Sequence, residues 1–262
     1  MAYISPTLTL MISAVKKAAA ALGRDFNELE HLQNSVHADN SFALRSYEKV
    51  QKILREELSK IKAGYPAVCA AQDALPASGK FFAVCPLDGF ANFAHGNAAF
   101  ALAAALIEDN NAVASVVYSP INDELFFAEK GSGAFKEGFR NHERLRVAAA
   151  KNTDKALVAA NADAGAVKAA LAVSVNPRIS GATVLDLAYV AAGKTDAAIA
   201  AKSDFCTLSA GALLVKEAGG YIFAIGETDT RSENLQKALL GGSIFATNEA
   251  LKQKIAEAIA KN

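Results

Sequence analysis

Residues 85–93 read CPLDGFANF and come directly after the apolar run FFAV at residues 81–84. A short apolar run bounded by turn residues is typical of a buried strand. Asp88 therefore stands where a strand gives way to a loop, ahead of Gly89 and its backbone N–H group. A carboxylate in that position suits a site that holds a metal ion and a phosphate together. The alternative interpretation is a tight turn in which Asp88 only caps the backbone.

More apolar runs follow this segment, separated by turn-forming stretches such as DNN at residues 109–111. They occupy residues 100–107, 112–118, 124–128 and 133–135. Short runs between closely spaced turns predict an antiparallel meander.

Two amphipathic helices are predicted ahead of this meander. Ser5 and Pro6 form a helix start, because a capping hydroxyl is followed by a proline at the first helical position. A second helix is predicted over residues 47–62, with charged residues on its wet face. Apolar residues recur at three- and four-residue spacing in both, as Leu8, Ile12, Val15, Ala19 and Leu22 in the first and Val50, Ile53, Leu54, Leu58 and Ile61 in the second.

The remainder of the chain alternates between strand and helix patterns. The strands are predicted at residues 157–160, 197–200, 221–225 and 243–246, and the helices at 166–172, 184–192, 208–218 and 248–260. Alternation of this kind predicts an α/β organisation. We therefore predict a layered α/β/α/β/α sandwich in one compact unit. Its N-terminal half, residues 1–145, carries paired long helices and an antiparallel sheet, and its C-terminal α/β half spans residues 146–262.

Composition excludes several classes of function. The 27 Lys and Arg residues balance the 27 Asp and Glu residues, so no net basic field favours nucleic-acid binding. The longest apolar run, residues 98–107, is far shorter than the roughly 20 residues of a membrane span. The first ten residues lack the pattern of a signal peptide. Three widely spaced cysteines without a CxxC pair disfavour a zinc site or a disulfide framework. We expect a cytoplasmic protein with no membrane association.

The segment at residues 85–93 resembles the Asp-Pro-Ile/Leu-Asp-Gly-Thr-x-Asn-Phe signature of the inositol monophosphatase family. Other segments resemble the same family in register: YSPINDELF at 118–126 with EKG at 129–131, GATVLDLAYVAAG at 181–193 and AGALLVKEAGG at 210–220. The similarity covers nearly the whole chain and is greatest to the bacterial extragenic-suppressor branch. It implies the inositol monophosphatase / fructose-1,6-bisphosphatase type of fold, a homodimer, and a Mg²⁺-dependent hydrolase of inositol monophosphates and related small phosphate esters.

Most residues that would hold Mg²⁺ in that family are replaced in this chain. The metal-binding glutamate falls on Gln72, the first aspartate of the signature on Cys85 and a later aspartate on Thr207. Leu87 still offers the backbone carbonyl that serves as a ligand, and Asp88 is retained. A thiol is a soft ligand, poorly matched to a hard ion. One metal-binding carboxylate therefore remains of the four that the resemblance implies.

The positions that would orient water and substrate are changed as well. The threonine of the signature falls on Phe90, the serine of the Gly-Ser-Ala segment on Ala182 and a glutamate near the sugar on Ala200. An early Lys-Gly-x-x-Asp-x-x-Thr-x-x-Asp stretch falls on residues 37–47, where the family's lysine, first aspartate, threonine and second aspartate become His37, Ser41, Leu44 and Tyr47.

These replacements predict a family member that has lost phosphatase activity, needs no cofactor and acts by binding. The ligand would be a protein partner, or a small anion held by the N–H groups of Gly89 and Phe90. The first alternative is an active hydrolase with rearranged ligands, in which Asp73 or Asp204 rebuilds a shifted metal site. A purely structural or assembly role is the second.

Two further side chains have alternative interpretations. Cys85 is either a nucleophile or an inert buried thiol, and no histidine is placed by the sequence to act as its base. His95 is either a base or a surface histidine. The other histidines have no partner at ligand spacing, and the Gly193-Lys194-Thr195 stretch lacks the preceding glycine of a P-loop.

Overall fold

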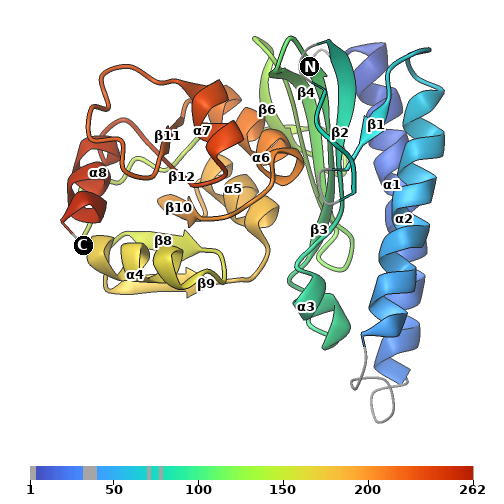
Figure 1. Cartoon of the computed structure of the whole chain (residues 1–262), viewed down its shortest axis with the longest axis horizontal. Coiled ribbons are helices and arrows are strands. Elements are labelled where there is room, and N and C mark those ends of the chain that lie inside the picture. Colours follow the sequence, from blue (N-terminus) through green and yellow to red (C-terminus); the bar gives the residue numbers. More distant parts are fainter. Residues whose placement is uncertain (1–3, 32–39, 70–71, 77–78, 262) are drawn as a thin grey trace.

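The outermost layer of the fold consists of two long helices, α1 (Pro6–His31) and α2 (Ser41–Ser59), packed side by side (Figure 1). The computed structural model describes residues 4–31, 40–69, 72–76 and 79–261. Ser5 Oγ accepts a hydrogen bond of 3.2 Å from the Leu8 amide at the start of α1, and Pro6 takes the first helical position. The predicted helix start is therefore confirmed, and its side-chain cap contributes about 1 kcal/mol to helix stability.

The N-terminal sheet lies against these helices and follows chain order from β1 to β7. β1 pairs with β2 in parallel, and every later pair is antiparallel, which confirms the predicted meander from β2 to β6. The strands are β1 (Ala67–Val68), β2 (Lys80–Asp88), β3 (Ala101–Glu108), β4 (Asn111–Ser119), β5 (Glu124–Glu129), β6 (Gly133–Lys136) and β7 (Glu143–Arg144). The short helix α3 (Phe90–Ala94) follows β2 directly.

The C-terminal sheet has the order β11-β12-β10-β8-β9. Its strands are β8 (Leu157–Ala160), β9 (Asn176–Ile179), β10 (Ala197–Ala200), β11 (Tyr221–Ala224) and β12 (Ile244–Thr247). β8 is parallel to both β9 and β10, whereas β12 is antiparallel to its two neighbours. Helices α4 (Ala164–Val173) and α8 (Lys252–Ala260) cover its outer face, and α7 (Leu235–Gly241) lies beside β11.

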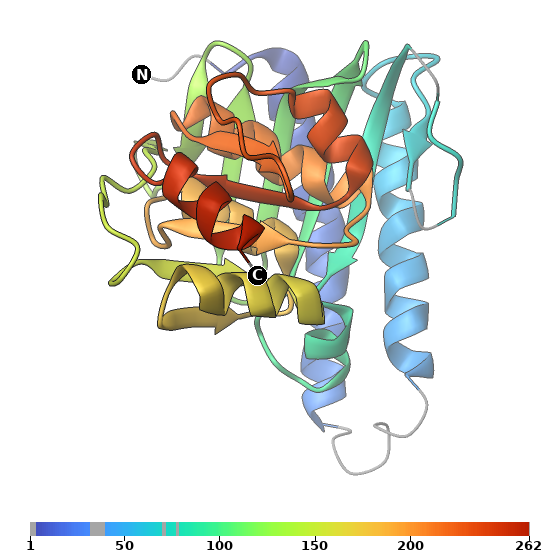
Figure 2. The same ribbon diagram turned by 60° about the vertical axis from the view of Figure 1, so that its left-hand side comes forward.

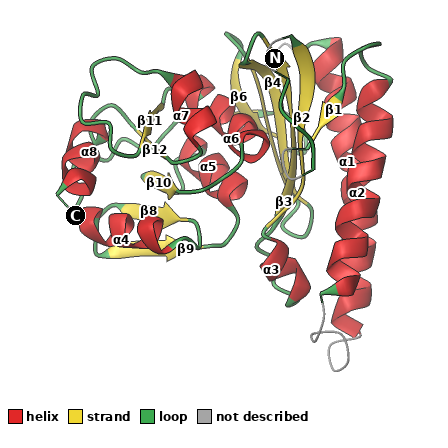
Figure 3. Cartoon of the chain, viewed as in Figure 1, coloured by secondary structure: helices red, strands yellow, loops and turns green. Residues whose placement is uncertain are grey.

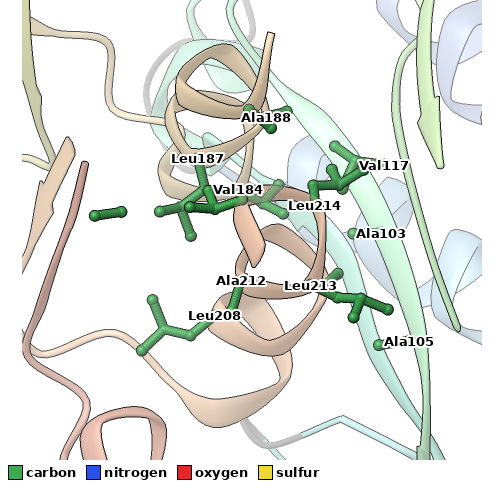
Figure 4. Close-up of a cluster of buried hydrophobic side chains, with 14 of the residues drawn as sticks. Ala103, Ala105, Val117, Val184, Leu187, Ala188, Leu208, Ala212, Leu213 and Leu214 are labelled. Carbon is green, nitrogen blue, oxygen red and sulfur yellow. The ribbon is translucent and has the colours of Figure 1, made fainter. Parts of the chain in front are cut away.

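Helices α5 (Thr183–Ala191) and α6 (Phe205–Glu217) form the layer between the two sheets (Figure 3). Leu213 and Leu214 of α6 lie there against small residues of the N-terminal sheet, Ala103 and Ala105 (Figure 4). Gly211 permits the close approach of the two helices, because a Cβ at this position would lie 2.6 Å from the Leu187 side chain. The layered α/β/α/β/α prediction is confirmed, and the turned view in Figure 2 brings the C-terminal sheet and its helices to the front.

Several boundaries differ from the predictions. α2 begins at Ser41 instead of residue 47, because Ala43 and Ser46 extend the buried stripe of Val50 and Leu54. The last helix begins at Lys252 instead of residue 248. Asn248 lies in the turn before it, and its Oδ1 accepts a hydrogen bond from the Leu251 amide. Strand β9, helix α7 and the two-residue strands β1 and β7 were not predicted. No helix in the described part of the chain combines the length and the hydropathy that a membrane span requires.

Candidate functional site

A pocket of about 260 Å³ lies at the end of β2, where the two halves of the fold meet α2. Residues 84–90 form one wall, and the side chains of Tyr47, Cys69, Asp204 and Thr207 complete it. The register between β2 and β3 shifts between Cys85 and Asp88. An irregularity of this kind re-aims side chains at the end of a strand and is common beside functional sites.

The structure brings most of the predicted metal-site positions together. Cys85, Leu87, Asp88, Gly89, Phe90 and Thr207 all line the pocket. Gln72 is exposed and lies outside it. Ala182 and Ala200 are buried in the hydrophobic core between the sheets and do not line it either. His37 lies outside the described residues.

Thr207 connects Cys85 to Asp204 through its hydroxyl. Its Oγ1 lies 2.7 Å from Asp204 Oδ2 and 3.3 Å from Cys85 Sγ. A hydroxyl has one proton to donate, and a carboxylate can only accept, so the proton goes to Asp204. The same oxygen then accepts from the Cys85 thiol. These three residues, the Cys85–Thr207–Asp204 chain, satisfy one another without a cation.

This arrangement favours the interpretation of Cys85 as an inert buried thiol over that of a nucleophile. Burial is the main cause that raises the pKa of its thiol well above the usual value, and the nearby carboxyl groups of Asp88 and Asp204 add to the effect. Because the thiolate is the reactive form, a thiol held in this way is a poor nucleophile. No histidine of the described part of the chain lines the pocket, and His95 is exposed at the end of α3.

Asp204 and Asp73 are both engaged by donors of the protein itself. Asp204 is the N-cap of α6 and accepts from the Thr207 amide at 2.9 Å in addition to the Thr207 hydroxyl. Asp73 Oδ2 accepts from Arg55 at 2.6 Å and from the Cys69 amide at 2.8 Å. A metal ion at either carboxylate would compete with these hydrogen bonds for the negative charge.

Asp88 joins the N-terminal sheet to the layer between the sheets. Its Oδ2 accepts a 2.5 Å hydrogen bond from the Val184 amide at the start of α5. Burial raises the pKa of this carboxyl to about 7, while hydrogen bonds from the Val184 and Gly89 amides act in the opposite direction. Near neutral pH a proton therefore competes with any cation for Asp88.

The donor set of the pocket does not fit Mg²⁺. This ion prefers carboxylate, carbonyl and water oxygens and usually needs one or two carboxylates. The pocket offers a thiol at Cys85, a titrating carboxyl at Asp88, and the Thr207 hydroxyl and Asp204 carboxylate, which are hydrogen-bonded to each other. Within the described ranges, no group of three or more His, Cys, Asp and Glu side chains is placed to hold a metal ion.

The backbone at Gly89 is constrained by packing. Its φ of 84° lies in the left-handed region, and a Cβ there would be 2.7 Å from the Ala99 carbonyl oxygen. Its amide is hydrogen-bonded to the Asp88 carboxyl. Phe90 begins α3, and Asn92 of that helix donates to the Ser180 carbonyl at 2.7 Å. Residue 89 must therefore be glycine for the backbone to turn between β2 and α3, independently of what the pocket binds.

Tyr47 and Cys69 also line the pocket, and of the two only Cys69 was not connected with the site by the sequence motifs. The Tyr47 hydroxyl reaches in from α2 and lies 2.9 Å from Cys69 Sγ. Tyr47 stands where the resembled early motif has its second aspartate, and it precedes Val50 and Leu54 by three and seven residues and so shares their stripe. Burial raises the pKa of its phenol. No local pattern pointed to Cys69.

Thr207→Val is expected to lower the free energy of unfolding by about 1–2 kcal/mol. The substitution keeps the shape of the side chain but removes the hydroxyl, which leaves Asp204 Oδ2 and the Cys85 thiol without their partner. Thr207→Ser keeps the hydroxyl and is the matched control. Urea unfolding at pH 7 measures both, and equal losses in the two variants would show that the hydroxyl does not stabilise the site.

Comparison with known proteins agrees with the sequence motifs. The model of the inositol monophosphatase family matches residues 5–262. The inositol-1-monophosphatase of Mesorhizobium japonicum is 33% identical over 98% of this chain and 97% of its own length. The Nus factor SuhB of Xylella fastidiosa is 30% identical over 83% of this chain and 81% of its own length. The crystal structure of the extragenic suppressor protein suhB from Bartonella henselae superimposes with a TM-score of 0.82 at 31% identity, covering 99% of this chain and 100% of that one. This chain belongs to the inositol monophosphatase family.

Proposed function

We propose that this chain is a non-catalytic member of its family and acts by binding. The observation that carries the proposal is the Cys85–Thr207–Asp204 chain, in which Cys85 and Thr207 stand where the resembled family places metal-binding carboxylates. Hydrolysis of a phosphate ester in such a site needs cations to offset the charge of the phosphate and to activate water. Because Asp204 is already held by the Thr207 amide and hydroxyl, Asp88 and the Leu87 carbonyl supply too few hard ligands for that task.

The binding partner that we favour is another protein. The pocket is lined by two carboxyl groups, Asp88 and Asp204, and by no Lys, Arg or His side chain of the described residues, so it disfavours a small anion at Gly89 and Phe90. A relative named as a Nus factor, rather than as an enzyme, supports a role outside ester hydrolysis. The zero net charge disfavours nucleic acid as the partner.

A homodimer is part of the proposal. Leu171, Val175 and Ile179 are exposed next to or on β9, which is the edge strand of the C-terminal sheet, with exposed fractions of 58%, 80% and 54%. Apolar side chains beside an open sheet edge favour association, and two-fold pairs are the commonest oligomers. Light scattering should give twice the 27.3 kDa of one chain at micromolar concentration. A mass of one chain would contradict the dimer.

The alternative is an active hydrolase with rearranged ligands, which the relatives named inositol-1-monophosphatase support. Purified protein is expected to release phosphate from inositol monophosphate no faster than a mock preparation, with or without millimolar Mg²⁺. Calorimetric titration with Mg²⁺ in the presence of phosphate should show no binding heat. Mg²⁺-dependent release that Asp88→Asn abolishes would establish the hydrolase and overturn the proposal.

A further inference from the structure

Phe139, in the connection between β6 and β7, exposes its whole side chain to solvent. Its exposed fraction is 100%, and no other Phe or Tyr side chain of the described residues is exposed. Burial of a phenylalanine side chain stabilises a fold by about 1.5–3 kcal/mol, which this chain does not gain here. A single exposed apolar side chain is common on protein surfaces, so the surroundings of Phe139 decide whether it has a role.

Both flanks of this connection are held by the rest of the molecule. On one side, the Glu137 amide donates to the Leu125 carbonyl at 2.8 Å, and the Glu137 carboxylate pairs with Lys16 of α1 at 2.6 Å. On the other side, the His142 ring packs edge-on against the buried Phe127 ring, with 5.0 Å between the ring centroids. The four residues between these two anchors therefore project from fixed points.

The turn between the anchors is tightly closed. A Cβ at Gly138 would lie 2.3 Å from the Asn141 carbonyl oxygen, so a side chain at this position would force the turn open. Phe139 and Arg140 lie within the turn, and both are exposed. A side chain that is presented by a preformed turn loses less entropy on binding than one that has to be ordered first.

The segment that begins in this turn is basic, although the chain as a whole carries no net charge. Residues 140–146 contain three arginines, Arg140, Arg144 and Arg146, and one acid, Glu143, and all four are exposed. The arginines that form ion pairs within the described part of the chain lie elsewhere, and the guanidinium groups of Arg140 and Arg144 have no carboxylate partner there. Their charge is therefore available to a ligand.

Arg144 also lies on the open edge of the N-terminal sheet. It belongs to β7, which pairs with β6 on one side and with no described strand on the other. Its guanidinium is packed over Gly133, where a Cβ would lie 3.2 Å from Arg144 Nη2. A free strand edge can bind an extended peptide through its backbone groups.

We propose that the β6–β7 surface, which comprises Phe139, Arg140, Arg144 and the open edge of β7, docks an extended acidic segment of a partner protein. Phe139 contacts an apolar side chain of that segment, and the two arginines bind its carboxylates. Aromatic and arginine side chains are enriched among the residues that dominate binding energy at protein interfaces. The inference rests on the proposed function in that the partner is a protein, and it adds the surface and the chemistry that recognise it.

Single-stranded RNA is the other ligand that combines contacts to aromatic rings and to basic side chains. Proteins that bind it stack successive bases on aromatic rings along a positively charged groove. The β6–β7 surface has one exposed ring, and the chain supplies no net positive field. An acidic peptide segment is therefore the better fit.

Selection from a random dodecapeptide library displayed on phage tests the proposal. Peptides that are enriched on the parent protein and depleted on Phe139→Ala should carry a net negative charge and at least one apolar residue. In fluorescence anisotropy with the synthetic peptides, affinity should fall about tenfold in Phe139→Ala and about fivefold in Arg140→Gln. Urea unfolding should be the same for both variants and the parent, because both side chains are exposed.

Leu240→Ala and Arg24→Gln are the matched controls. They remove an exposed apolar side chain from α7 and an exposed arginine from α1, and they should leave peptide affinity unchanged. Enriched peptides without an excess of acidic residues, or no difference in enrichment between the parent and Phe139→Ala, would overturn the proposal. An oligouridylate of the same length that binds more tightly than the peptides, and that loses affinity in the same variants, would overturn it in favour of RNA.

These measurements involve no phosphate ester, so their outcome can be separated from that of the proposed function. Mg²⁺-dependent hydrolysis would overturn the non-catalytic proposal and leave peptide docking on the β6–β7 surface unaffected. Failure to enrich acidic peptides would overturn the docking surface and leave the loss of hydrolysis unaffected.

Discussion

The variant that combines Gln72→Glu, Cys85→Asp, Phe90→Thr and Thr207→Asp is expected to be less stable than the parent without metal, and to regain stability with Mg²⁺. Cys85→Asp and Thr207→Asp add two carboxylates to a pocket that already holds Asp88 and Asp204. Clustered like charges without a cation repel and resist ionisation, so we expect a loss of about 3–5 kcal/mol near neutral pH.

Millimolar Mg²⁺ should narrow or reverse the difference in stability between the variant and the parent. An ion that binds only the folded state stabilises it by about 2.7 kcal/mol at a hundredfold excess over its dissociation constant. The parent should melt at the same temperature with and without Mg²⁺, because its donor set does not fit the ion. Hydrolytic activity should stay low in the variant, since Ala182 and Ala200 are buried in the core and leave the substrate side unrepaired.

A neutral version of the same variant is the matched control. Cys85→Asn and Thr207→Asn introduce side chains of the same shape as aspartate but without charge. Without metal, this variant should therefore lose less stability than the charged variant, and Mg²⁺ should not stabilise it. Melting temperature with and without Mg²⁺ measures all three proteins. If the parent gains as much from Mg²⁺ as the charged variant does, its site has never lost the metal.

Asp186→Asn is expected to raise the free energy of unfolding by several kcal/mol at pH 8 and to have little effect at pH 4. Asp186 lies in the first turn of α5 with 4% of its surface exposed, and its Oδ2 is buried without a hydrogen-bond partner among the described residues. Burial is the main cause that raises its pKa from 3.8 to about 8. The neighbouring Asp88 adds to this shift, and a hydrogen bond with Ser180 opposes it.

The sign of the pH dependence follows from proton binding. Between pH 4 and pH 8 the folded protein keeps the Asp186 proton while the unfolded chain releases it, so the stability that this group contributes falls as the pH rises. The asparagine variant lacks this loss. Its free energy of unfolding relative to the parent should therefore rise by up to about 1.4 kcal/mol per pH unit between pH 4 and pH 8. Above pH 8 the advantage should level off.

Urea unfolding at several pH values measures this difference. Asp154→Asn, at an exposed position, is the matched control and should follow the parent at every pH. An advantage of Asp186→Asn that is the same at pH 4 and pH 8 would contradict a proton held by the folded state.

The layers of the fold could be predicted from local patterns. β8 and β10 have the predicted bounds, and the strands from β2 to β6 coincide with the apolar runs. A strand buried on both faces leaves a continuous run of apolar residues in the sequence, so its position can be read locally. Strand β9 escaped prediction because Pro177 interrupts its pattern. Proline has no backbone N–H to donate within a sheet, so it is tolerated only in an edge strand. β9 is such a strand because it pairs with β8 on one side only, which the local sequence does not show.

The identities of the pocket residues at Cys85, Asp88 and Thr207 followed from the motifs, and with them the loss of carboxylates. Their chemical state did not, because it depends on atoms that meet only after folding. Cys85 and Thr207 are 122 residues apart in the chain and 3.3 Å apart in space, and the proton between them is directed by Asp204. The pKa of Asp88 likewise depends on the amide of Val184, 96 residues away. Periodicity records which side chains are buried, whereas desolvation and hydrogen-bond partners depend on the distant segments that bury them, and only tertiary packing brings those segments together.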